Sequence, residues 1–182
     1  MMLMWPFILL RLACHTSVNG SLYTLFIRIS ARMVWRSMLM QDDYGTSADI
    51  VRIRLAASQE KLDEAVDLYD KAIQKQRSFN GSVSRAYYSV FKAISAIHMV
   101  NGRAYKRHKD AIAKFNEYHV HGGDFPRETG RKLSHAQQRR ENSDYDDFYH
   151  ATQDEAAEQI AFAREFLEQA KSYCRMHGVM ID

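Results

Sequence analysis

The chain has 182 residues, of which 46% are hydrophobic and two are proline, and this composition suits one helical domain with a sizeable core. The net charge of +3 misrepresents that domain, because residues 1–40 hold 4 of the 25 basic residues and none of the 22 acidic ones. The remaining residues therefore carry a net charge of −1. Overall charge cannot attract a nucleic acid to this domain, so any such binding needs a local basic patch.

The two cysteines, Cys14 and Cys174, stand far apart and form neither a disulfide framework nor a metal motif. This usage predicts a reducing, cytoplasmic compartment.

Residues 1–40 differ from the rest of the chain, since they are apolar, bear arginines and lack acidic residues. They fit a signal or transit segment, a membrane-surface arm, or an over-extended reading frame with the true start at Met38 or Met40, which we favour. The opening apolar run stops at Arg11, too early for a stable membrane span. We therefore expect an N-terminal extension over 1–40 and a helical domain over 41–182.

The first two helices are predicted from apolar residues that recur at helical spacing. The first covers about 48–75 and is followed by a break at Asn80-Gly81. The second begins near Ser82 and ends at Asn101-Gly102, a pair typical of a helix C-terminus.

Three further helices complete the expected fold. The third covers about 105–119, and the fourth covers about 126–142, with Pro126 at its first turn. The fifth follows a capping box formed by Thr152 and Glu155 and continues to about 175. With no strand pattern, the chain is predicted to be an all-α, antiparallel bundle of four or five helices.

The second helix combines core positions with polar ones. One of Tyr87 and Tyr88 is expected in the core, and the other is expected to face the fourth helix with its hydroxyl engaged. Ser84 and Arg85 are expected near that polar seam. The expected core positions of this helix are Val83, Val90, Phe91, Ile94 and Ile97.

Two basic segments, residues 103–114 and the fourth helix, can form a phosphate-binding face. The alternative is that they are two solvated helix faces. The candidate nucleic-acid or nucleotide-binding residues are Arg107, His108, Arg131, Lys132 and Arg139.

Arg140 and Asp144 are four residues apart, so on a helix they would form an ion pair. In a functional interpretation, Arg140 stabilises developing negative charge while a neighbouring group moves a proton, as phosphodiester chemistry requires. The aspartates from Asp144 onward lack the spacing of a calcium loop, and no common cofactor motif occurs. We expect neither a metal nor a cofactor.

Four segments, taken in order and at their mutual distances, resemble the HEPN superfamily over residues 50–174. They are "SRAYYSVFKAISAI", "KRHKDAIAKF", "RENSDY" and "AEQIAFAREFLEQA". The match is nearest to an uncharacterised bacterial and archaeal branch with an S-R-A-Y-Y-x-x-F helix and a later R-x-x-[A/S]-D-Y.

The resemblance implies a helical bundle that usually forms a homodimer. Many family members are metal-independent RNases of toxin–antitoxin, anti-phage or CRISPR systems, with an R-x(4–6)-H active site assembled across the dimer. Relatives of this branch are often encoded beside a minimal nucleotidyltransferase, and some are thought to bind nucleotides.

The chain departs from that motif. Arg140 matches the motif arginine, but Tyr145 stands where the histidine is expected, and His150 is too far along. Lys92 replaces another histidine frequent in relatives. Neutral tyrosine is a poorer base at pH 7 than histidine, which argues against RNase activity. If the chain does cleave RNA, Arg140 and Tyr145 are the candidate catalytic pair.

The expected function is a protein that interacts with RNA or nucleotides in a toxin–antitoxin or defence module. The alternative is a non-catalytic interaction partner of a minimal nucleotidyltransferase. In either case the expected polar seam consists of Ser84, Arg85, Tyr88 and Asp144.

Overall fold

The computed structural model describes residues 45–181, and the expected extension over 1–40 and the start at Met40 lie outside the described residues. Within 45–181 the chain is all helical and contains no strand, which confirms the expected fold class. The elements, in order, are α2 (Ser47–Lys75), α3 (Asn80–Val100), α4 (His108–Phe115), a π-helical turn η1 (Asn116–Val120), α5 (Arg127–Tyr145) and α6 (Gln153–Met176).

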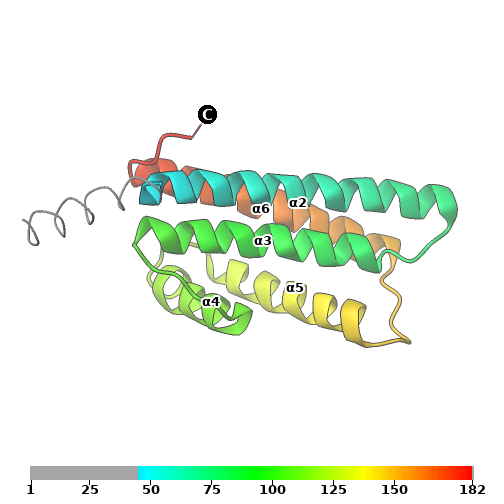
Figure 1. The fold of residues 1–182 in the computed structure, drawn as a ribbon. Helices are drawn as coiled ribbons and strands as arrows, with labels where there is room; N and C mark the ends of the chain where they lie inside the picture. Colours follow the sequence, from blue (N-terminus) through cyan, green and yellow to red (C-terminus); the bar gives the residue numbers. More distant parts are fainter. Residues whose placement is uncertain (1–44, 182) are drawn as a thin grey trace, which may run out of the picture. The chain divides into compact units, whose positions relative to one another are not determined.

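Helix α2 begins at a capping box and ends at a residue with a left-handed backbone conformation. The Thr46 side chain accepts a hydrogen bond from the backbone of Asp49, and the Asp49 carboxylate accepts one from the backbone of Thr46 at 2.7 Å. Gln76 then reverses the chain with φ 48°. Figure 1 shows α3 returning beside α2, where Ser58 donates a buried hydrogen bond of 2.8 Å to the carbonyl of Ser89.

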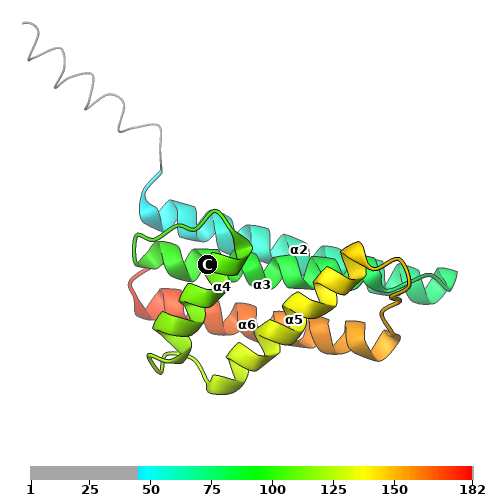
Figure 2. The ribbon, with the colours of Figure 1, turned by 90° about the horizontal axis from the view of Figure 1, so that it is seen from below.

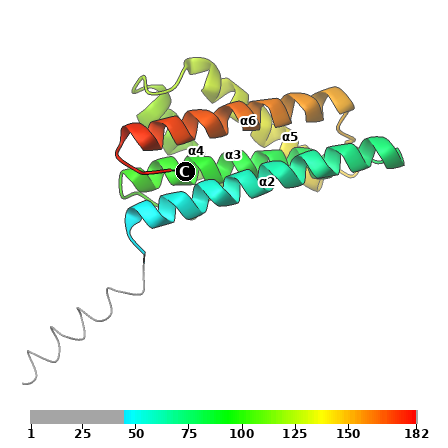
Figure 3. The ribbon, with the colours of Figure 1, turned by 90° about the horizontal axis from the view of Figure 1, so that it is seen from above.

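Helix α3 is the centre of the bundle and contacts α2, α4, α5 and α6. Figure 3 shows α2 and α6 on one side of it, and Figure 2 shows α5 crossing α3 and α6 obliquely on the other. Because neighbours surround α3, most of its side chains are buried, including Val83, Val90, Ile94 and Ile97, as expected from the sequence.

Phe91 is an exception to the expected core of α3. Its side chain is only partly buried and packs against the core from its edge. The ring stacks on the imidazole of His108, with 3.7 Å between the ring centroids. Phe91 therefore links the core to the polar face of α3.

The expected third helix is shorter and less regular than the sequence indicated. It begins at His108 rather than near residue 105, and it changes after Phe115 from α-helical to π-helical hydrogen bonding. The wider turn carries both His119 and Val120 into buried positions.

Helix α5 extends three residues beyond its expected end at 142. Its last turn therefore includes Asp144 and Tyr145, which were expected in a connection. Helix α6 begins after Thr152 with the expected capping box. The longer α5 matters for function, because Arg140 and Asp144 now lie on one helix face.

Candidate functional site

Arg140, near the end of α5, is the centre of a polar cluster between α5 and α3. Its Nη2 donates a hydrogen bond of 2.8 Å to the hydroxyl of Tyr88 on α3. Its Nε lies 2.9 Å from Oδ2 of Asp144 in an ion pair. The hydroxyl of Tyr145 also lies within hydrogen-bonding reach of this guanidinium. The guanidinium is thus oriented by two partners and retains N–H donors for a ligand.

Three tyrosine rings surround this guanidinium. Its Cζ lies 5.3 Å from the ring centroid of Tyr145, 5.4 Å from that of Tyr88 and 6.0 Å from that of Tyr87. Rings at these distances attract a cation through their π faces. Tyr87 is buried, whereas Tyr145 is 75% exposed. Arg140 therefore lies between the core and an aromatic ring that solvent reaches.

A groove lies between α3 and α5. Ser84 on α3 donates a hydrogen bond to Oδ1 of Asp144, so this carboxylate joins the two helices. Arg85 lies on the rim, with its Nε 3.1 Å from Glu64 of α2. All four predicted seam residues line the groove, namely Ser84, Arg85, Tyr88 and Asp144.

An imidazole from α4 reaches the same cluster. His108 Nδ1 lies 3.3 Å from the hydroxyl of Tyr87, and its ring meets Tyr88 edge to face at 5.7 Å. Burial lowers the pKa of His108, and the positive charges of Arg140 and Lys92 lower it further. Burial raises the pKa of Tyr87 to about 12. Both groups are therefore uncharged at neutral pH, and Arg140 is the cation of the cluster.

This arrangement suits the recognition of an anion with an attached ring system. The free N–H groups of Arg140 can bind phosphate oxygens with two parallel hydrogen bonds. The exposed ring of Tyr145 can stack on a base. The sequence indicated no partner for His108, because α4 brings it to Tyr87 and Tyr88 only in the folded chain.

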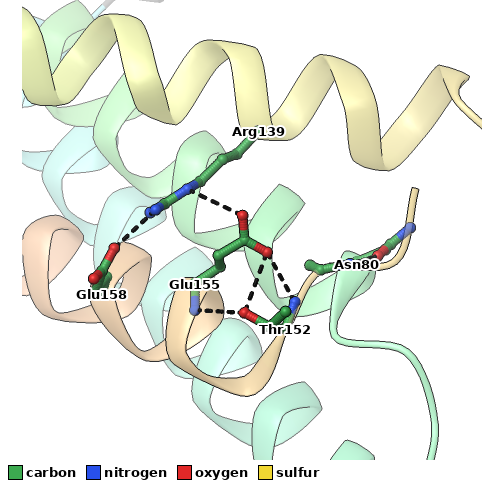
Figure 4. Close-up of polar contacts among 6 residues, drawn as sticks. Asn80, Arg139, Thr152, Glu155 and Glu158 are labelled. Carbon is green, nitrogen blue, oxygen red and sulfur yellow. Dashed lines mark hydrogen bonds and ion pairs between the residues drawn. The ribbon is translucent and has the colours of Figure 1, made fainter.

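Two of the predicted binding residues face α6 instead of this groove. Figure 4 shows Arg139 between Glu158, at 2.8 Å, and Glu155, at 3.9 Å. Lys132 lies 3.4 Å from Glu165 and 3.5 Å from Glu128. Carboxylates already neutralise these cations, so they hold α5 on α6.

Two more of the five predicted binding residues, Arg107 and Arg131, are also apart from Arg140. Arg107 is exposed at the residue before α4. Arg131 is exposed on α5 and lines a different groove, next to η1. The structure thus groups Arg140, Tyr145, His108 and the seam residues, and separates Arg107, Arg131, Lys132 and Arg139 from them.

Asn80 supports the site and was missed in the sequence, where Asn80-Gly81 indicates only a helix break. Its Nδ2 donates to the carbonyls of Tyr149 at 2.9 Å and Ser143 at 3.3 Å. Its Oδ1 accepts a hydrogen bond of 2.8 Å from the backbone of Ala151. Asn80 therefore positions the connection between α5 and α6, close to the capping box of α6 (Figure 4).

No three His, Cys, Asp or Glu side chains between residues 45 and 181 converge as metal ligands do. No helix in this part of the chain is both long and apolar enough to cross a bilayer.

The fold and this seam define a helical-bundle protein with an arginine–tyrosine cluster between two helices. The HEPN domain family model matches residues 51–173, and the chain belongs to this family. A curated relative, a UPF0332 protein from Thermotoga maritima, is 26% identical over 111 residues, which cover 61% of this chain and 80% of the relative.

Proposed function

We propose that this HEPN-domain protein binds phosphate groups of RNA or of a nucleotide at the Arg140 cluster between α3 and α5, as part of a toxin–antitoxin or defence module in the cytoplasm. The observation that carries the proposal is the state of Arg140. Tyr88 and Asp144 orient its guanidinium, and its five N–H donors outnumber the partners that Tyr88, Asp144 and Tyr145 offer. A pre-oriented guanidinium loses little freedom when it binds, which favours affinity.

The neighbouring rings support a nucleotide rather than a bare anion. Tyr145 is 75% exposed and lies beside Arg140, so a base can stack on it while Arg140 holds the phosphate. Phe148, 92% exposed on the following connection, offers a second ring. Asp146 and Asp147 lie beside it and oppose a long polyanion there, which limits the expected contact to a few nucleotides.

Binding is better supported than cleavage. Tyr145 occupies the position of the motif histidine, and a neutral phenol is a weak base at pH 7. His108 is the one imidazole in contact with the cluster within the described residues, and it comes from α4 instead of α5. We propose a homodimer, in which the Arg140 clusters of two chains would come together.

A second candidate function is that of a non-catalytic partner of a minimal nucleotidyltransferase. The observation in its favour is the exposure of Tyr145 and Phe148, because exposed aromatic side chains are enriched in protein–protein interfaces. In that case, Arg140 and Asp144 act as a structural ion pair.

Charge removal at Arg140 tests the proposal. Arg140→Ala should weaken binding of a short fluorescent single-stranded RNA or of ATP by tenfold or more, measured by anisotropy and calorimetry. Arg140→Lys should recover little, because lysine keeps the charge but not the planar fork. The matched control is Arg139→Ala, which removes an adjacent arginine that already pairs with Glu158 and should change affinity less than twofold.

Two results would contradict the proposal. Equal losses in Arg140→Ala and Arg139→Ala would indicate a general charge effect. An unfolded Arg140→Ala protein, together with unchanged ligand affinity in Arg140→Lys, would identify Arg140 as a structural residue. RNA cleavage that disappears in Arg140→Ala would add an activity to the binding site.

A further inference from the structure

A second groove lies between η1 and the first half of α5. It has a volume of about 860 Å³. It shares no lining residue with the α3–α5 groove that contains Ser84 and Asp144. The lining residues that bear on its chemistry are Asn116, His121, Arg127, Gly130, Arg131 and His135.

The charged side chains that line this groove are all basic. Arg127, Arg131 and His135 recur every four residues and so share one face of α5. Within residues 45–181, neither Arg127 nor Arg131 forms an ion pair, and no acidic side chain lines the groove. Lys132 and Arg139, which face α6 on the same helix, are both paired with glutamates. The groove thus concentrates uncompensated positive charge.

Asn116 gives an independent indication of a ligand. It begins the π-helical turn, a geometry found frequently at functional sites. Asn116 lines the groove, and its Oδ1 is buried without a hydrogen-bond partner within the described residues. Gly130 makes room for this amide, because a Cβ there would lie 3.0 Å from Oδ1. The groove therefore places a side-chain amide with an unpaired oxygen beside its arginines.

We infer that the η1–α5 groove binds phosphate groups. Arginine fits phosphate oxygens with paired hydrogen bonds, and the positive end of the α5 dipole lies in the same region. The residues that line the groove include no Phe, Tyr or Trp, so it recognises phosphates and not bases. The phosphates belong either to a nucleic-acid strand or to the polyphosphate of a free nucleotide, and the inference does not depend on ligand binding at Arg140.

The test uses the full chain carrying both Arg127→Gln and Arg131→Gln. The control carries Arg164→Gln and Arg175→Gln, two exposed arginines of α6 without ion pairs in the described part of the chain. Both proteins lose the same charge. The probes are inorganic tripolyphosphate, measured by calorimetry, and a 12-nucleotide single-stranded RNA, measured by anisotropy at several salt concentrations.

The groove variant should bind at least one probe tenfold more weakly than the unaltered chain, and the control should change less than twofold. Loss for RNA, with a salt dependence reduced by about two phosphate contacts, assigns the groove to a strand. Loss for tripolyphosphate alone assigns it to a free polyphosphate. Equal losses in the groove variant and the control, unchanged affinity in the groove variant, or no binding of either probe to the unaltered chain would each overturn the inference.

Arg140→Ala in the same assays separates the two sites. If Arg140→Ala has no effect while the groove variant loses affinity, the proposed function at Arg140 fails and this inference stands. If Arg140→Ala loses affinity while the groove variant does not, the site at Arg140 stands and the inference about the η1–α5 groove fails.

Discussion

At the scale of single residues, the orientation of Arg140 depends on one hydroxyl from another helix. Tyr88→Phe removes the acceptor of the 2.8 Å hydrogen bond from Nη2 and leaves the ring in place. We expect the free energy of unfolding to fall by about 1–2 kcal/mol, because a donor on a charged group loses its partner. Ligand affinity should fall several-fold, since the guanidinium is less well oriented. Urea unfolding and anisotropy measure the two effects.

Tyr145→Phe is the matched control for Tyr88→Phe. Tyr145 is 75% exposed, so the loss of its hydroxyl should change stability by less than about 0.5 kcal/mol. Its ring remains for stacking, and binding should persist. If the chain cleaves RNA and Tyr145 acts as the proton-transfer group, cleavage alone should fall. A loss of binding in Tyr145→Phe would contradict a role limited to stacking.

Phe166 and Phe91 allow a buried core position to be compared with a partly buried one at the edge of the core. Phe166 is fully buried and contacts the rings of Phe115, Phe125 and Phe162. Phe166→Ala should therefore lower the free energy of unfolding by about 3–5 kcal/mol. Phe91→Ala should lower it by about 1–2 kcal/mol, because a partly buried ring removes less apolar surface from water. Chemical denaturation should give this order, and equal losses would contradict it.

At the scale of elements, the start of α6 tests the capping interaction that the sequence predicts. Thr152 Oγ1 accepts a hydrogen bond of 3.2 Å from the backbone of Glu155, and the Glu155 carboxylate accepts one of 2.9 Å from the backbone of Thr152. Thr152→Ala should destabilise the protein by about 1 kcal/mol. Thr152→Ser keeps the hydroxyl and should differ little from the unaltered chain. Similar melting temperatures for Ala and Ser would show that the cap contributes nothing.

At the scale of the whole molecule, stability should decrease as the solution is acidified below neutral pH. Burial lowers the pKa of His98 from 6.5, with smaller effects from the charges of His119, Arg103 and Arg54, and it also lowers the pKa of His108 from 6.5. The unfolded chain then binds protons more readily than the folded chain. The stabilisation that comes from keeping these two histidines neutral is fully present above pH 6.5. It is lost as the pH falls through their lowered folded-state pKa values.

Urea unfolding between pH 5 and pH 7.5 measures this dependence. His98→Gln should reduce the slope of stability against pH, whatever its effect at pH 7.5. Acidic groups such as Glu155, whose pKa is lowered by hydrogen bonds from Thr152, titrate in a more acidic range and do not contribute here. A stability independent of pH in this range would contradict the buried neutral state of His98.

The boundary of the folded unit is also testable for the whole molecule. The capping box of Thr46 and Asp49 is complete in a chain that begins at Met40. Such a chain should therefore melt cooperatively and with the helicity of the 182-residue chain, measured by circular dichroism. Loss of cooperative melting would show that residues 1–39 contribute to the core.

The positions of the helices were predictable because their determinants are local. Periodic apolar residues, the Asn101-Gly102 pair and the Thr152–Glu155 capping box act within one or two helical turns. The same locality explains the errors. The π-helical turn after Phe115 and the last turn of α5 depend on what those residues pack against, which no local pattern encodes.

The sequence by itself determined the fold class, the tyrosine pair of α3 with one ring in the core, and the pairing of Arg140 with Asp144 four residues later. Each of these follows from spacing along a helix. Only the tertiary structure decided that His108 joins Tyr87 and Tyr88, whereas Arg139 turns to Glu158 of α6. Which charges and rings meet depends on how the helices are rotated and crossed, and that is set by the packing of the whole core.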